Sequence, residues 1–168
     1  RAIGCSNATL EHMDEYRRVG QLDVDQELYS MIDRKHESEN LPYCAENNIA
    51  FLAYSALGQG LLTGKIGPDR TFNEGDLRKR QERFSVENRR RVSAMLDEFK
   101  PVAEKHGATL GQLAIAWTVA QHGCSHALIG ARDENQAFDN ARAGDIVLSD
   151  DDLGKMQQAV EAHTPHIV

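Results

Sequence analysis

The chain has 168 residues, of which 40% are hydrophobic and 27% are charged, and its formal net charge at pH 7 is −7. This length and composition are those of one soluble globular domain, so we treat residues 1–168 as a single domain. The acidic balance argues against a surface for nucleic acid or for an anionic membrane. Basic residues cluster at positions 78–80 (RKR) and 89–91 (RRR), which we interpret as solvated faces.

The cysteine content and the absence of long apolar runs indicate where in the cell the protein is located. Three cysteines, Cys5, Cys44 and Cys124, are an odd number without metal-like spacing, so we expect no disulfide framework and no metal site. No run approaches the ~18 apolar residues that a membrane-spanning helix needs, and no signal peptide is recognised. We therefore expect a cytoplasmic protein. The start at Arg1, inside an expected strand, is what a fragment of a longer chain would show.

Strands and helices are predicted to alternate along the chain. Thr9 can cap the first helix and Gly20 can end it. Thr109 and Gln112 have the spacing of a capping box, which opens a helix whose apolar stripe places Trp117 in the core. The expected strands are residues 2–5, 22–29, 49–54 and 126–129. The expected helices are residues 10–18, 37–47, 85–106, one from 109 onward, 133–142 and 149–163.

Two prolines and one long connection interrupt the predicted alternation of strands and helices. Pro42 must lie in the first turn of its helix or break it, and Pro101 marks a kink or a restart. Residues 58–83 form a polar, Gly-containing loop that is longer than most connections and is therefore predicted to be functional. Four alternating strands and helices imply parallel β/α units, which by themselves could form a small doubly wound sheet.

Each predicted strand ends in polar residues. They are Ser6 and Asn7, then Gln26, then Tyr54 and Ser55, and then residues 130–132. Interior strands of a parallel sheet should be apolar, so polar groups gathered at one end of every strand indicate a shared ligand. Each residue alone has a simpler explanation, such as capping a turn or satisfying a backbone group. Their coincidence favours a binding site.

The segment after the third strand carries the strongest local signal. Residues 53–65 read AYSALGQGLLTGK, which places an aromatic ring, a hydroxyl, three glycines and Lys65 beyond the C-terminal end of a strand. Ligands bind at this end in β/α proteins. Glycines allow close approach to a phosphate and lysine supplies the opposing charge, so an anion or nucleotide loop is one interpretation. An ordinary Gly-rich turn is the other.

This segment resembles the seventh strand and following loop of the aldo-keto reductases, usually close to AYSPLGQGLLTGK, with Ala56 here in place of the proline. Residues 1–7 (RAIGCSN) are similar to the fifth strand of that family, residues 26–30 (QELYS) to the sixth and residues 128–132 (LIGAR) to the eighth. The resemblance implies an α/β fold that is the C-terminal half of a (β/α)8 TIM barrel. Four parallel β/α units would be followed by an extra C-terminal helix.

The same resemblance implies a site for NADP or NAD. Ser6, Asn7 and Gln26 match positions that hydrogen-bond the nicotinamide carboxamide, and Tyr54 matches the ring that stacks on the nicotinamide. The loop at 58–83 would form a strap over the cofactor. Pyrophosphate contacts would come from Ser55, Leu57, Gln59 and Gly60, and strap cations from Lys65 and Arg70.

At the adenosine end, the family pattern matches Gly130, Arg132, Gln136, Asp139 and Asn140, with Asp139 where a Glu is usual. Arg132 could stack on adenine or pair with a 2′-phosphate, which favours NADP slightly. A solvated polar helix face is the alternative for this segment.

The implied reaction is reduction of a small aldehyde or ketone to an alcohol by NAD(P)H. The family's catalytic Tyr, Lys, Asp and His belong to the first half of the barrel, so we expect no catalytic residue in this chain and no activity of it alone. Closure of the barrel would require a missing N-terminal half or self-association of this chain. The alternatives are a non-catalytic nucleotide-binding module, like the potassium-channel β subunits that resemble this family, and an inactive self-associating half-barrel.

Overall fold

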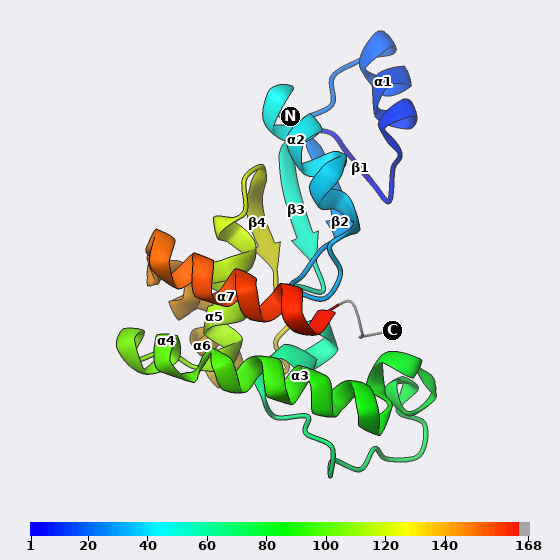
Figure 1. The fold of residues 1–168 in the computed structure, drawn as a ribbon. Helices are drawn as coiled ribbons and strands as arrows, with labels where there is room; N and C mark the ends of the chain where they lie inside the picture. Colours follow the sequence, from blue (N-terminus) through cyan, green and yellow to red (C-terminus); the bar gives the residue numbers. More distant parts are fainter. Residues whose placement is uncertain (165–168) are drawn as a thin grey trace.

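Four short strands lie side by side in one parallel sheet, in the order in which they occur in the chain (Figure 1). The computed structural model describes residues 1–164. All pairings are parallel, as the alternating pattern predicts, and helices make the crossovers. The strands are β1 (Gly4–Ser6), β2 (Val24–Leu28), β3 (Ala50–Tyr54) and β4 (Cys124–Leu128).

Helices occupy most of the remaining chain, and none within the described residues is long and apolar enough to cross a membrane. Three short 3₁₀ turns, Gly58–Thr63, Leu77–Arg80 and Glu82–Phe84, lie in the predicted loop at 58–83. Figure 1 shows α2 beside β3, whereas α3 lies next to α7. The helices are α1 (Leu10–Val19), α2 (Asn40–Glu46), α3 (Val86–Glu98), α4 (Lys100–His106), α5 (Leu110–Ala120), α6 (Glu134–Ala141) and α7 (Asp150–His163).

Local signals place most helix ends correctly. Thr9 and Thr109 accept hydrogen bonds from the N–H groups of the third residues of α1 and α5, in capping boxes. Pro101 is the second residue of α4, so the predicted restart is confirmed, and Phe99 separates α4 from α3. Pro42 lies in the first turn of α2, which begins at Asn40 rather than at 37 because residues 35–38 form a 3₁₀ turn.

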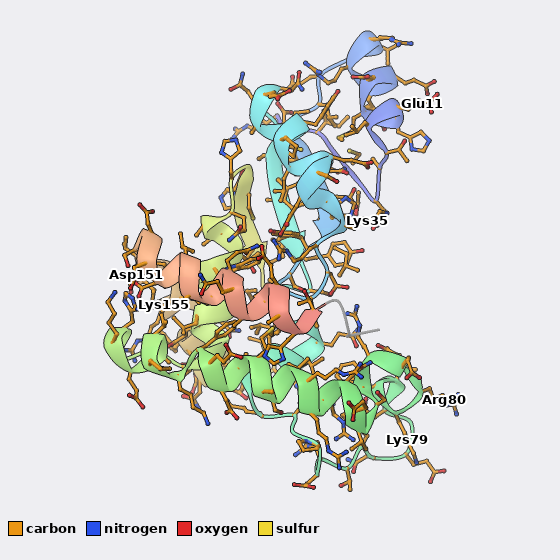
Figure 2. The ribbon with its side chains drawn as sticks, in the orientation of Figure 1. Glu11, Lys35, Lys79, Arg80, Asp151 and Lys155 are labelled. Atoms are coloured by element: carbon orange, nitrogen blue, oxygen red, sulfur yellow. The ribbon has the colours of Figure 1, made fainter. Side chains whose placement is uncertain are left out.

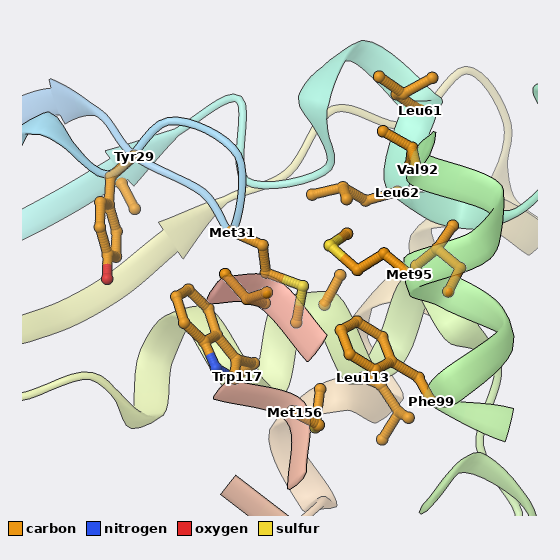
Figure 3. Packing of buried hydrophobic residues seen from close by; sticks show 14 of the residues in the cluster. Tyr29, Met31, Leu61, Leu62, Val92, Met95, Phe99, Leu113, Trp117 and Met156 are labelled. Atoms are coloured by element: carbon orange, nitrogen blue, oxygen red, sulfur yellow. The ribbon is translucent and has the colours of Figure 1, made fainter. Parts of the chain in front are cut away.

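The core joins the sheet to α3, α5 and α7 and also holds the turn after β3 (Figure 3). Trp117 of α5 is fully buried, as predicted, and its ring stacks on that of Tyr29 with 6.2 Å between ring centroids. Leu61 and Leu62, from the 3₁₀ turn after β3, are buried in the same cluster as Met95. The start of the predicted functional loop is therefore anchored by apolar packing.

The two faces of the sheet differ in burial. In β2 and β3, Asp25, Glu27, Phe51 and Ala53 are buried, whereas the residues between them are only partly buried. Within residues 1–164, β1 and β4 each pair with one strand, so the sheet has the two free edges expected of four strands. Closure of this sheet into an eight-stranded barrel stays a prediction.

A buried carboxylate joins the start of α7 to α4. Asp152 is 2% exposed and accepts hydrogen bonds from Lys105 (2.8 Å) and from the Ser149 hydroxyl (2.6 Å). His106 Nε2 lies 3.0 Å from the same carboxylate. Lys105 first, and then Ser149, hold the pKa of the Asp152 carboxyl well below its usual range.

Asp152→Asn should lower the free energy of unfolding at pH 7 by about 1–2 kcal/mol, because it removes the acceptor of these charge-assisted hydrogen bonds. Since the folded-state pKa is depressed, this contribution is present above the unfolded value of ~3.9 and is lost as the pH falls below it. Urea unfolding between pH 7 and pH 3 should show the two proteins converging at acid pH.

Asp151→Asn is the matched control. Asp151 pairs with Lys155 at 2.7 Å, but both side chains are largely exposed and point away from the molecule (Figure 2). Its loss should leave the stability nearly unchanged, because an exposed ion pair contributes little. Equal losses for the two variants would contradict the role of burial at Asp152.

Candidate functional site

A cavity of about 620 Å³ lies beyond the C-terminal ends of β3 and β4. Its walls come from the segment after β3, the segment after β4, α6 and the start of α5. The residues predicted for the phosphates and the adenosine, which are far apart in the sequence, all line it. They are Ser55, Leu57, Gln59, Gly60, Lys65, Arg70, Gly130, Arg132, Gln136, Asp139 and Asn140.

The segment after β3 forms a tight left-handed turn at the cavity wall. Ser55, Gly58, Gln59 and Gly60 all have positive φ, and Gly60 has the largest at 95°. The N–H groups of Gly58 and Gly60 donate to backbone carbonyls within the turn, at 2.7 Å and 3.0 Å. These two N–H groups are therefore committed within the turn and are not available to an anion.

Cations outnumber acids around the cavity. Lys65, Arg70, Arg78 and Arg132 line it, and Asp139 is the one carboxylate among the lining residues. Asp139 accepts a hydrogen bond from the buried Gln112 of α5 at 2.9 Å, which ties α6 to α5. The cavity thus offers a positive surface suited to a ligand with several negative charges.

Arg78 is a lining residue that the sequence did not reveal. Its guanidinium pairs with Asp76 at 2.6 Å and lies over the Phe72 ring, 5.1 Å from the centroid. Hydrogen bonds from Arg78 lower the pKa of Asp76 to about 2. The interpretation of residues 78–80 as a solvated face holds for Lys79 and Arg80, which lie at the periphery (Figure 2), but is wrong for Arg78. In the sequence, the position of Arg78 inside the predicted functional loop was the sign that it lines the cavity.

The second basic cluster also contains an inward-pointing residue. Arg89 of α3 is 6% exposed, and its Nη1 donates to the carbonyls of Gly67 (2.8 Å) and Arg70 (2.7 Å). Its guanidinium lies 5.4 Å from the centroid of the Phe72 ring, the ring that Arg78 also covers. The prediction of a solvated face is therefore wrong for Arg89, which fastens the 58–83 loop to α3.

At the adenosine-side segment, hydrogen bonds hold α6 against the end of β4. Asp133 caps α6 by accepting from the Gln136 N–H at 2.9 Å. The Gln136 side chain accepts from the Arg132 N–H at 3.1 Å, and Asn140 donates to the Gly130 carbonyl at 3.4 Å. Gln136 and Asn140 lie on one face of the helix, as their spacing predicted, and that face borders the cavity.

The residues predicted for the nicotinamide lie apart from this cavity. The Tyr54 hydroxyl donates to Asn7 Oδ1 at 2.8 Å, and both residues line a second cavity of about 290 Å³. Ser6 Oγ donates to the Gln26 carbonyl at 2.9 Å, and the two residues are in register. Gln26 lies in the middle of β2 rather than at its end, because β2 continues two residues beyond the last residue of β1.

Comparisons with known proteins identify the family and the fold of this chain. The model of the aldo/keto reductase family matches residues 1–161. This chain belongs to that family. It is 39% identical over 162 residues to the NADH-specific methylglyoxal reductase of Escherichia coli (strain K12), covering 96% of this chain and 49% of that protein. It is 36% identical to aldo-keto reductase YhdN of Bacillus subtilis (strain 168), covering 81% and 41%.

A solved structure extends the likeness to the fold. The glycerol dehydrogenase AKR11B4 from Gluconobacter oxydans superposes with a TM-score of 0.92 at 34% identity, over 100% of this chain and 51% of that one. The chain therefore spans about half the length of the aldo/keto reductases that it matches. It shares with this neighbour the parallel α/β arrangement described above.

None of the other three tyrosines lines either cavity of this aldo/keto reductase chain. Tyr29 is fully buried and donates to Glu37 at 2.8 Å, and burial raises the pKa of its hydroxyl. Tyr43 donates to Asp14, and Tyr16 lies exposed on α1. The prediction that residues 1–168 contain no proton-donating tyrosine stays a prediction, and these contacts favour it.

Arg89→Met should release the 58–83 loop, because it removes two charge-assisted hydrogen bonds to the loop backbone. Trypsin cleavage after the exposed Lys79 and Arg80 should become about tenfold faster, since cleavage follows local opening. Timed digestion with mass analysis would measure this rate. Arg90→Met, at an exposed neighbouring position of α3, is the matched control, and equal cleavage rates in both variants would contradict the anchoring role.

Proposed function

We propose that this chain binds NADPH or NADH for the reduction of a small aldehyde or ketone to an alcohol. The observation that carries the proposal is the 620 Å³ cavity, which brings together every residue predicted for the phosphates and the adenosine. The family membership supports this reaction class, and the likeness to a methylglyoxal reductase of Escherichia coli supports a small carbonyl substrate.

The donor set of the cavity fits a dinucleotide. A pyrophosphate carries two negative charges and a 2′-phosphate adds more, and four cationic side chains face this space. Lys65 and Arg70, with Arg78 beside them, would hold the phosphates. Arg132 would contact adenine or the 2′-phosphate, while Gln136 and Asn140 would read the edge of the base.

The nicotinamide would lie at the ends of β1, β2 and β3. Ser6, Asn7 and Gln26 would hydrogen-bond its carboxamide, and the Tyr54 ring would stack on one face. The bound cofactor supplies a hydride. The contribution of these residues is to fix the ring so that the opposite face meets the substrate.

The proton donor would come from a part of the barrel outside residues 1–168. In this proposal the four strands are the C-terminal half of an eight-stranded barrel. The partly buried face of β2 and β3 would then face the barrel interior, and the free edges of β1 and β4 would pair with further strands. Those strands would be supplied by the rest of the polypeptide or by a second copy.

Gly60→Ala should raise the dissociation constant of NADPH about tenfold or more, because alanine is strained at φ 95° and its Cβ would meet Ile66 Cδ1 at 3.3 Å. Fluorescence titration of the full-length protein would measure the change. Gly67→Ala is the control in the same loop, since no atom lies within 4 Å of its added Cβ. Binding without turnover of any carbonyl would instead favour the regulatory-module alternative.

Arg132→Ala tests the preference for NADP. If Arg132 pairs with the 2′-phosphate, its loss should weaken NADPH binding about 10- to 100-fold and NADH binding much less. The two dissociation constants, measured side by side, give the answer. Arg142→Ala makes the same charge change outside the cavity and should leave both constants in place. An equal loss for NADPH and NADH in Arg132→Ala would contradict the preference.

A further inference from the structure

The turn between β1 and α1 is held in an unusual conformation. Asn7 has φ 54°, in the left-handed region that most residues avoid. Its own N–H donates to the Gln26 carbonyl at 3.2 Å, and its side chain connects the Ser6 hydroxyl (3.1 Å) to the Tyr54 hydroxyl (2.8 Å). The placement of both polar groups of the Asn7 side chain therefore depends on this backbone geometry.

The residue after Asn7 is clamped on both of its backbone polar groups. The Ala8 N–H donates to Glu27 Oε1 at 2.7 Å, and the Ala8 carbonyl accepts from Asn40 Nδ2 at 3.2 Å. Glu27 and Asn40 are each 2% exposed and come from different elements, β2 and α2. Two buried side chains thus fix the two peptide units on either side of the Ala8 Cα, directly after the left-handed residue.

His36 contacts both Glu27 and Asn40, and these three side chains together form a clamp on the Ala8 backbone. Asn40 Nδ2 also donates to Asp25 Oδ2 at 2.9 Å, so Asn40 Oδ1 must accept, and His36 Nδ1 donates to it at 2.8 Å. The other ring nitrogen, His36 Nε2, faces Glu27 Oε2 at 3.4 Å.

The surroundings favour the protonated form of the Glu27 carboxyl. Burial raises the pKa of the Glu27 carboxyl to about 7, and the neighbouring Asp25 acts in the same direction. Other titratable groups nearby are the Cys5 thiol on β1, the Cys44 thiol on α2 and the exposed Lys35. Asp33, which lines the same cavity as Glu27 and His36, pairs with Arg83. The second cavity is lined by Asn7 and Tyr54 together with Glu27 and His36, so the clamp borders the nicotinamide side of the site.

We propose that Glu27, His36 and Asn40 are positioning residues that set the turn at Asn7 and thereby hold Asn7 and Tyr54 in place for the nicotinamide. This inference rests on the proposed function, and it adds a second layer behind the residues that would touch the cofactor. A purely structural role would be met more cheaply by apolar packing, because buried ionisable groups cost free energy. The hydrogen bonds of Glu27 and Asn40 to the Ala8 backbone explain why polar groups are used.

The test compares two ligands that differ only in the nicotinamide. NADPH or NADH, whichever binds tighter, reports on both ends of the site. ADP-ribose, or its 2′-phosphate, keeps the adenosine and the phosphates but has no nicotinamide. Calorimetry on the full-length protein gives both dissociation constants, and the fluorescence of the reduced nicotinamide reports its environment directly.

Glu27→Leu should weaken dinucleotide binding about three- to tenfold, the worth of one misplaced hydrogen bond, and leave ADP-ribose binding unchanged. Glu27→Gln should bind both ligands as tightly as the wild-type protein does. The glutamine amide oxygen can accept from the Ala8 N–H while its NH₂ group donates to His36 Nε2. If Glu27→Leu fails to fold, His36→Leu breaks the same clamp from its far side and carries the same expectation.

The outcomes separate the two levels of the proposal. Equal losses for both ligands, no loss in folded Glu27→Leu or His36→Leu, or failure of Glu27→Gln to restore binding, would overturn the positioning role and leave the proposed function standing. Failure of the wild-type protein to bind either ligand would overturn the proposed function, and the positioning role with it. A selective loss of the nicotinamide-bearing ligand, restored by Glu27→Gln, would support both.

Discussion

Parallel pairing is the constraint on which the rest of the structure depends. Because all four strands run in one direction, the chain leaves each of them at the same edge, and segments distant in sequence meet there. The register of the strands determines the shape of this edge. Tyr54 is level with Leu28 and Leu128, whereas β1 ends at Ser6, level with Gln26. The edge is therefore stepped, and the Tyr54 hydroxyl reaches across the step to Asn7.

Sequence reasoning succeeded where the signal was local or rested on a long motif. Capping residues such as Thr109 and the break at Pro101 are set by backbone hydrogen bonds within a few residues, so a sequence can reveal them. The segment at 53–65 identified the cavity wall because aromatic, glycine and lysine residues occur there in a family-specific order. The interpretation of that wall as a cofactor site still came from the resemblance.

The failures involve side chains whose surroundings are made by distant segments. Arg78 and Arg89 occur in basic runs that look like solvated faces, yet each packs on Phe72 because the loop folds back onto α3. No local pattern distinguishes Arg89 from the exposed Arg90. In the same way, no sequence signal predicted the burial of Asp25 and Glu27 in β2, where partners on α2 and in the β1–α1 turn satisfy both carboxyl groups. Strand pairing, not residue type, decides which acids are buried.

In the 58–83 loop, the groups that hold the loop in place differ from the side chain that faces the cavity. Arg89 binds the backbone carbonyls of Gly67 and Arg70, while the side chain of Arg70 lines the cavity. Every amino acid provides a carbonyl, so the anchor does not depend on which side chain stands at position 70. That position is consequently open to change: evolution or an engineer can alter the charge presented to a ligand there while the path of the loop stays the same.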